Sequence, residues 1–154
     1  MKRRTFLTGL GISILAAPLA SSNVARAAKS MIFTGLVAGT AVGGYDPVAY
    51  FTRGRPTPGK PQHSLTHDGA KWLFSSAENL AKFKANPAKY APQYGGYCAY
   101  AVANGYTAKG EPEAWSVVGG KLYLNYSQSI RLRWKAKQAA FITEANKNWP
   151  GVLN

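Results

Sequence analysis

Cysteine is almost absent from the sequence, since Cys98 is the single one among 154 residues. Small secreted domains that are held together by disulfides carry an even set of cysteines, so a disulfide framework within the chain is excluded. The sequence also lacks a Cys-x-x-Cys redox pair and a glycine-rich phosphate-binding motif. The fold must therefore depend on an apolar core, for which four Trp and nine Tyr supply large side chains.

Acidic residues are scarce, with six Asp and Glu against 19 Lys and Arg. The six are spread over residues 46–144 and form neither a recognisable paired-carboxylate site nor a Cys-His-Asp set, so we predict that the protein is not an enzyme. The net charge of +13 favours contact with acidic partners or, peripherally, with an anionic membrane surface.

Long hydrophobic runs are absent too. The longest run, residues 6–20, is interrupted by glycine and proline and is shorter than the roughly 20 residues that span a bilayer. It follows Arg3-Arg4 and precedes the small-residue site Ala25-Arg26-Ala27, an order typical of a twin-arginine signal peptide. We therefore predict that residues 1–27 are cleaved off after Ala27. The mature protein is then periplasmic, and nucleic acid is not an expected partner.

The remaining 127 residues, with a net charge of +9, have the size of one compact domain. The tight-turn signals Asp68-Gly69 and Gly119-Gly120 predict two β-hairpins, over residues 62–75 and 114–125. Capping residues and apolar spacing predict several short helices and a long C-terminal helix over residues 128–148.

These elements predict a small α+β domain over residues 45–150, in which the two hairpins join in one antiparallel sheet covered by helices. Residues 28–44 are small and glycine-rich, so we expect a flexible N-terminal segment there. Residues 151–154 are expected to form a short tail. No internal repeat is apparent in the sequence.

Several motifs resemble the YHS domain, in which an Asp-Pro-Val opening precedes a hairpin ending in Phe and a helix closing on Asn-Pro-x-Lys-Tyr. The residues that carry the resemblance are Asp46–Val48, Trp72–Ser76 and Phe83–Tyr90. The C-terminal part resembles an exported bacterial subgroup of YHS domain-containing proteins, so the resemblance covers about residues 45–150. Its matching residues are Tyr94–Ala99, Ala114–Val118 and Lys121–Asn125.

The resemblance implies a metal site only where the family's cysteines are kept. Metal-binding YHS domains, such as those attached to copper-transporting pumps, carry three cysteines at the positions that are Ala49, Ser75 and Asn79 here. A thiolate site at these positions is therefore not expected. Any metal would need other donors.

The remaining soft donors are Cys98, His67 and His63, and thiolate with imidazole suits copper or zinc. On a strand, the two histidines would lie on one face about 13 Å apart, so they could not share an ion. The hypothesis is an open site formed by Cys98 with His67, copper being favoured, or a site shared within a dimer. Two protein ligands fall short of the four of a structural zinc site.

Alternatives stay open for these residues. Cys98 is either a small buried core residue, the favoured interpretation, or a thiolate at a helix N-terminus, with an intermolecular disulfide as a third choice. Tyr94, Tyr97 and Tyr100 either line a pocket with their hydroxyls or are plain core aromatics.

Two functions follow from these alternatives. The first is periplasmic handling of a transition metal, with a metal-transport or metalloenzyme assembly protein as partner. The second is a metal-free accessory module that presents aromatic and basic side chains to another protein. The oligomeric state is not predicted.

Overall fold

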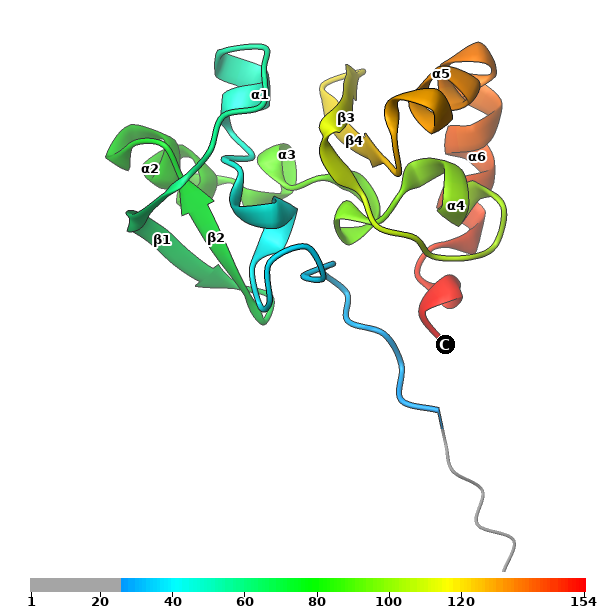
Figure 1. Cartoon of the computed structure of the whole chain (residues 1–154), viewed down its shortest axis with the longest axis horizontal. Coiled ribbons are helices and arrows are strands. Elements are labelled where there is room, and N and C mark those ends of the chain that lie inside the picture. Colours follow the sequence, from blue (N-terminus) through cyan, green and yellow to red (C-terminus); the bar gives the residue numbers. More distant parts are fainter. Residues whose placement is uncertain (1–25) are drawn as a thin grey trace, which may run out of the picture.

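The computed structural model describes residues 26–154 and has the predicted α+β class, with two halves side by side (Figure 1). All of the predicted signal peptide except Arg26 and Ala27 lies outside the described residues. No helix between residues 26 and 154 has both the length and the apolar character to cross a membrane. The helices are α1 Ala49–Thr52, α2 Ala77–Ala85, α3 Pro87–Tyr90, α4 Ala99–Ala103, α5 Gln128–Ala136 and α6 Gln138–Asn148. The strands are β1 Lys60–His67, β2 Ala70–Phe74, β3 Glu111–Val118 and β4 Lys121–Asn125, and the 3-10 turns are η1 Ala41–Gly44, η2 Gln93–Gly96 and η3 Gly151–Leu153.

Both predicted hairpins are present, but they form two separate two-stranded sheets in the described part of the chain, so the prediction of one joined sheet is wrong. The turn residues Asp68 and Gly69 have φ values of 49° and 74°, the left-handed geometry that a two-residue hairpin turn needs. The edge of β2 is taken by the N-terminal segment, because Lys71 N donates to Gly39 O (2.9 Å). That edge of β2 is therefore not free to pair with the other hairpin.

The long C-terminal helix is roughly as predicted, but it breaks at Lys137, which has φ −137° and ψ 41°. Ser127 caps α5 as expected, since its Oγ accepts a hydrogen bond from Ile130 N (3.2 Å). The break allows α5 and α6 to pack against different parts of the fold. α5 packs against the β3–β4 hairpin, whereas α6 packs mainly against α4.

The N-terminal segment 28–44, expected to be flexible, is instead held to the rest of the fold. Lys29 N donates to Leu153 O (2.8 Å), and Phe33 N donates to Gly95 O (2.9 Å). The first of these bonds also fixes the C-terminal tail, whose η3 turn buries the Leu153 side chain. Apolar side chains at both ends therefore find partners that their sequence neighbourhood does not reveal.

The two halves repeat the same structure. The order η1, α1, β1, β2, α2 is matched by η2, α4, β3, β4, α5. Both hairpins have an irregular register at the same place, between Lys60 and Ser64 in β1 and between Glu111 and Trp115 in β3. The structure thus shows a repeat that is not apparent in the sequence.

The backbone at the start of each half supports this correspondence. Val42, Gly43 and Gly44 have φ values of 52°, 56° and 85°, and Tyr94, Gly95 and Gly96 have φ values of 56°, 61° and 84°. The next tyrosine is followed by Asp46 in the first half and by Cys98 in the second. Asp46 N donates to Thr57 O (2.8 Å), and Cys98 N donates to Ala108 O (2.9 Å). Asp46 and Cys98 thus occupy equivalent positions.

Strand β4 joins the two halves. Leu122 and Leu124 belong to the core of the first half, which is built around Trp72. Tyr123, which points to the other side of the strand, belongs to the core of the second half with Trp134.

Candidate functional site

The buried carboxylate of Asp46 organises the first half. Its Oδ1 accepts hydrogen bonds from Val48 N (2.8 Å) and Ala49 N (3.3 Å) at the start of α1. Its Oδ2 accepts from Ser75 N (2.8 Å), Ser75 Oγ (2.6 Å) and Asn79 Nδ2 (2.7 Å). Asp46 is fully buried, and each carboxylate oxygen has at least two donors. We call this the Asp46 network.

Cys98 takes the place of Asp46 in the second half, and only 1% of its surface is exposed. Its Sγ donates to Asn125 Oδ1 at 3.6 Å. Burial raises the pKa of the Cys98 thiol above its ordinary value, although backbone hydrogen bonds from Ala101, Tyr126 and Tyr100 oppose this effect. The thiol is therefore neutral at pH 7, which agrees with the buried interpretation of this residue.

A cavity of about 200 Å³ adjoins Cys98. Three of its residues, Ala101, Tyr126 and Ile130, are equivalent to Ala49, Ser75 and Asn79 of the first half. Because these side chains are apolar or aromatic, no polar network fills the space as it does around Asp46. The full lining is Cys98, Tyr100, Ala101, Tyr106, Ala108, Tyr126 and Ile130, so it contains neither imidazole nor carboxylate.

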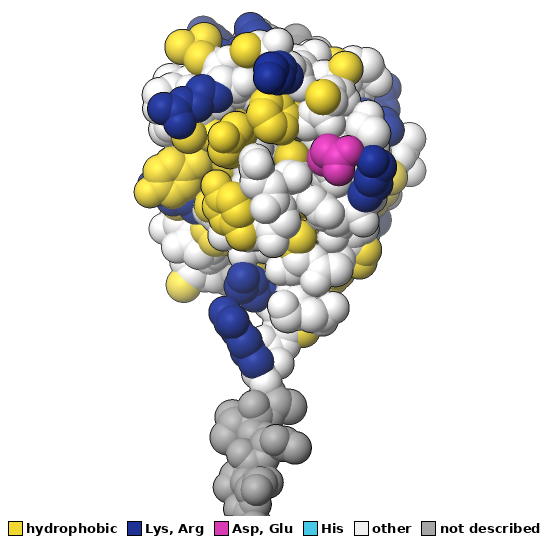
Figure 2. Space-filling view, turned by 90° about the vertical axis from the view of Figure 1, so that its right-hand side faces the viewer, with side chains coloured by type: hydrophobic (Ala, Val, Ile, Leu, Met, Phe, Trp, Pro, Cys, Tyr) yellow, Lys and Arg dark blue, Asp and Glu magenta, His cyan; other side chains and the backbone are white. Residues whose placement is uncertain are grey.

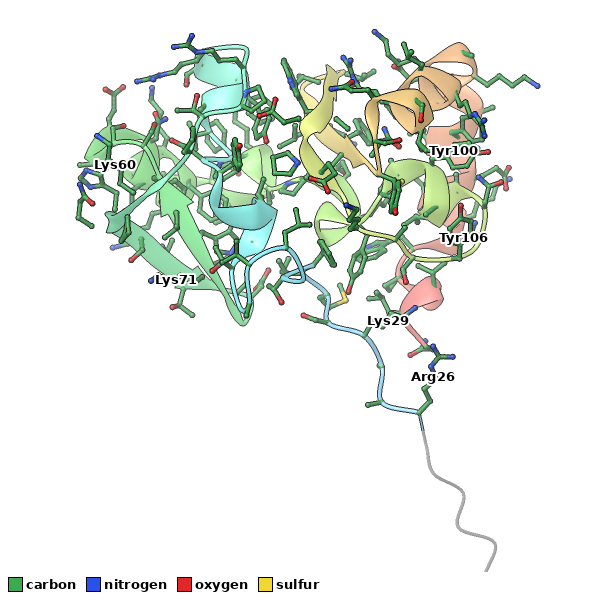
Figure 3. All side chains as sticks on the ribbon, in the orientation of Figure 1. Arg26, Lys29, Lys60, Lys71, Tyr100 and Tyr106 are labelled. Atoms are coloured by element: carbon green, nitrogen blue, oxygen red, sulfur yellow. The ribbon has the colours of Figure 1, made fainter. Side chains whose placement is uncertain are left out.

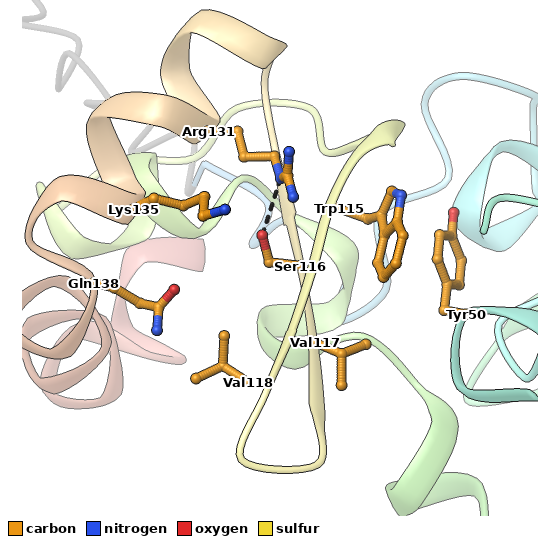
Figure 4. A pocket seen from close by; sticks show the side chains of 8 residues that line it. All are labelled: Tyr50, Trp115, Ser116, Val117, Val118, Arg131, Lys135 and Gln138. Atoms are coloured by element: carbon orange, nitrogen blue, oxygen red, sulfur yellow. Dashed lines mark hydrogen bonds between the residues drawn. The ribbon is translucent and has the colours of Figure 1, made fainter. Parts of the chain in front are cut away.

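A larger groove, of about 610 Å³, lies beside β3 (Figure 4). One wall is aromatic, formed by the rings of Tyr50 and Trp115, whose centroids are 5.4 Å apart. The opposite wall is cationic, formed by Arg131 and Lys135 of α5. We call this the β3 groove, and its lining is Tyr50, Trp115, Ser116, Val117, Val118, Arg131, Lys135 and Gln138.

The cations of the β3 groove have no carboxylate partner among residues 26–154, because all six acidic residues of the chain are engaged elsewhere. Arg131 contacts neutral groups instead, as its Nε donates to Ser116 Oγ (3.0 Å). The face shown in Figure 2 likewise carries several patches of Lys and Arg and little acidic surface. The acidic residues and their partners are Asp46 with its network, Asp68–His67, Glu78–Lys82, Glu111–Lys109, Glu144–Lys147 and Glu113–Tyr45.

The family model of the YHS domain matches residues 48–94. This segment of the chain is similar to the YHS domain. The matched segment runs from α1 through α3 and into η2, so it covers most of the first half, and the second half repeats its architecture outside the match. No curated protein and no solved structure matches the chain.

The positions of the YHS cysteines do not fit a thiolate-bound metal in this chain. Ala49 offers only a methyl group, and the Ser75 hydroxyl and Asn79 amide both donate to Asp46. No group of three or more His, Cys, Asp or Glu side chains that could hold a metal is found between residues 26 and 154. The Asp46 network occupies two of the three positions at which metal-binding YHS domains carry cysteine.

The structure does not bring Cys98 and His67 together. The His67 ring packs against Phe83 in the first half, with centroids 5.7 Å apart, and its Nε2 lies 3.3 Å from Asp68 Oδ2. His63 lies on the same strand, β1. Figure 3 shows the separation, because Lys60 and Lys71 mark the first hairpin while Tyr100 and Tyr106 mark the Cys98 cavity in the other half.

Of the three tyrosines proposed for a pocket, only Tyr100 lines the Cys98 cavity. Tyr94 and Tyr97 are buried, and their hydroxyls donate to Asn146 Oδ1 (2.8 Å) and Ser30 O (2.9 Å). Burial raises the pKa of both phenols. They are core aromatics, as the alternative interpretation held.

Sequence reasoning did not find the β3 groove, because its walls come from segments far apart in the chain. In the sequence, the basic run 131–137 has only the pattern of a solvated helix face. Tyr50 follows the Asp-Pro-Val motif, and Trp115 lies in the second hairpin. The packing of the two halves brings these side chains together, since the Tyr50 ring contacts Trp115 and its hydroxyl donates to Pro112 O.

Proposed function

We propose that the protein is an exported, non-enzymatic binding module that uses the YHS scaffold to engage a partner protein through the β3 groove. The observation that carries this proposal is the pairing of an aromatic wall with cations that have no carboxylate partner in the described chain. Aromatic residues and arginine are the side chains most enriched at the energetic centres of protein interfaces.

The Asp46 network supports a role without metal at the usual YHS position. Removing water from a carboxylate is unfavourable unless its oxygens are hydrogen-bonded, and here Ser75 and Asn79 supply those bonds. The residues that replace the cysteines thus have a structural task. The module would keep the YHS fold while its binding surface lies on the β3 groove.

Photo-crosslinking in the native cells tests this function. A benzoylphenylalanine replaces Val117, which is 37% exposed in the β3 groove, and a matched control replaces Lys84, which is exposed on α2. We expect a discrete adduct with one protein from position 117 that weakens when Arg131→Gln is added. The same adducts at both positions, or none at position 117, would reject the proposal.

The alternative function, handling of a soft metal ion through Cys98, would depend on the thiol alone, because the cavity beside it is lined by no imidazole or carboxylate. Copper is the favoured ion and zinc the alternative, and a metal-transport or metalloenzyme assembly protein would be the partner. Titration of Cu(I), Cu(II) and Zn(II) into the protein and into Cys98→Ser tests it. Stoichiometric binding that is lost in the variant supports this function, and equal, negligible binding in both rejects it.

A further inference from the structure

The outer edge of β3 faces the β3 groove. Val118 and Lys121 flank the two-residue turn, so they form a hydrogen-bonded pair, and in an antiparallel hairpin such pairs alternate with pairs that are not hydrogen-bonded. Trp115 and Val117 stand in the latter positions, opposite Leu124 and Leu122. Their backbone N–H and C=O groups therefore point away from β4.

These outward groups are open. Within residues 26–154, no hydrogen bond joins the backbone of Trp115 or Val117 to another element. The start of the same strand is closed instead, since Pro112 O accepts from Tyr50 OH (3.0 Å) and Glu113 O accepts from Gln128 Nε2 (2.6 Å). An unpaired strand edge is a template for a further strand. Here it is confined to the part of β3 that lines the groove.

The two faces of β3 differ in chemistry. Side chains alternate along a strand, so Trp115 and Val117 share one face, and Ser116 and Val118 share the other. Figure 4 shows Tyr50 beyond the Trp115 side and the α5 cations on the Ser116 side. A strand added at the edge of β3 would continue both faces. Its alternate side chains would meet apolar rings on one face and positive charge on the other.

We propose that the β3 groove binds an extended peptide segment of a partner protein in which acidic and apolar residues alternate, and that this segment adds as a strand to the free edge of β3. The inference rests on the proposed function and specifies its partner. The acidic side chains face Arg131 and Lys135, and the apolar ones pack on Trp115 and Val117. Backbone hydrogen bonds supply affinity, and the alternation supplies specificity.

Peptide binding to the purified protein tests the pattern. The probe is a fluorescein-labelled peptide of alternating Glu and Val, and the controls are a block peptide of the same composition and a peptide with Lys in place of Glu. We expect binding of the alternating peptide, at least about tenfold weaker binding of the block peptide, and none of the lysine peptide. Binding should weaken as salt rises, because exposed charge pairs are screened.

Backbone pairing is tested with Val117→Pro, matched by Val117→Ala. Proline removes the outward N–H, and edge strands tolerate it where that N–H faces solvent. We expect affinity for the alternating peptide to fall about tenfold for proline and little for alanine, as one hydrogen bond and a close backbone approach are lost. Hydrogen exchange on the unmodified protein gives an independent measurement. Peptide binding should protect the Trp115 and Val117 amides.

The cationic wall is tested with Arg131→Gln and Lys135→Gln, matched by Arg133→Gln, which is exposed on the same helix. Each groove variant should bind about two- to fivefold more weakly, the range of an exposed ion pair, and the control should bind normally. Equal binding of alternating and block peptides, or unprotected Trp115 and Val117 amides, would overturn strand addition. If the crosslink at position 117 persists in that case, the proposed function survives. If the peptide experiments and the crosslink both fail, strand addition and the proposed function are both rejected.

Discussion

Replacing Asp46 by Asn should strongly destabilise the protein while leaving its shape almost unchanged. The carboxylate accepts five hydrogen bonds, three of them at Oδ2. An amide keeps one acceptor oxygen, and its NH₂ group would face the donors at Ser75 and Asn79. At roughly 1.5–3 kcal/mol for each bond to a charged group, and with relaxation of the site, the expected loss is about 3–5 kcal/mol.

Urea denaturation followed by tryptophan fluorescence measures this loss, because the linear dependence of unfolding free energy on urea gives the difference between variants. Two matched variants calibrate it. Ser75→Ala removes one side-chain donor to Asp46 and should lower stability by about 1–2 kcal/mol. Asp68→Asn changes an exposed carboxyl and should stay within about 0.5 kcal/mol. A loss below about 1 kcal/mol for Asp46→Asn would refute the structural role of the network.

Three further predictions concern other parts of the chain. Burial raises the pKa of Cys98 and covers its sulfur. Iodoacetamide at pH 8 should therefore alkylate Cys98 far more slowly in the folded protein than in the urea-unfolded chain, and mass spectrometry measures both rates. Burial also raises the pKa of Tyr50, so the unfolded chain releases this proton first and stability should fall as pH rises above the ordinary tyrosine value of about 10. Urea midpoints between pH 8 and 11 should fall less steeply for Tyr50→Phe. Finally, Arg3→Lys combined with Arg4→Lys should leave the protein in the cytoplasmic fraction of cells that normally export it; export unchanged by the pair would contradict a twin-arginine signal.

Local chemistry explains which elements were predictable. The Asp68-Gly69 turn and the capped starts of the short helices depend on neighbours within a few residues, and the structure contains them, with Ser76 capping α2 and Asn86 capping α3. The break at Lys137 was not predictable, because it depends on how α5 and α6 meet different surfaces. The N-terminal segment was misjudged for a similar reason, since its partners lie near the far end of the sequence.

The candidate site was harder to predict than the fold. Cys98 is the single cysteine of the sequence, and the favoured expectation that it is buried agrees with the structure. Its equivalence to Asp46 could not be read from the sequence, because the two halves share a backbone path and little more than Gly-Gly-Tyr and a capping serine. The β3 groove was equally hidden, because its walls come from segments that are far apart in the chain.

The three central residues of β4 have a consequence for any attempt to divide this molecule. Leu122 and Leu124 are part of the core of the first half, around Trp72, whereas Tyr123 is part of the core of the second half. A fragment ending at residue 94 would keep the segment that matches the family model. It would lack Leu122 and Leu124, so the apolar side chains that pack against them would be exposed to water. The two halves therefore depend on each other for their cores, and we expect them to unfold together in one cooperative transition.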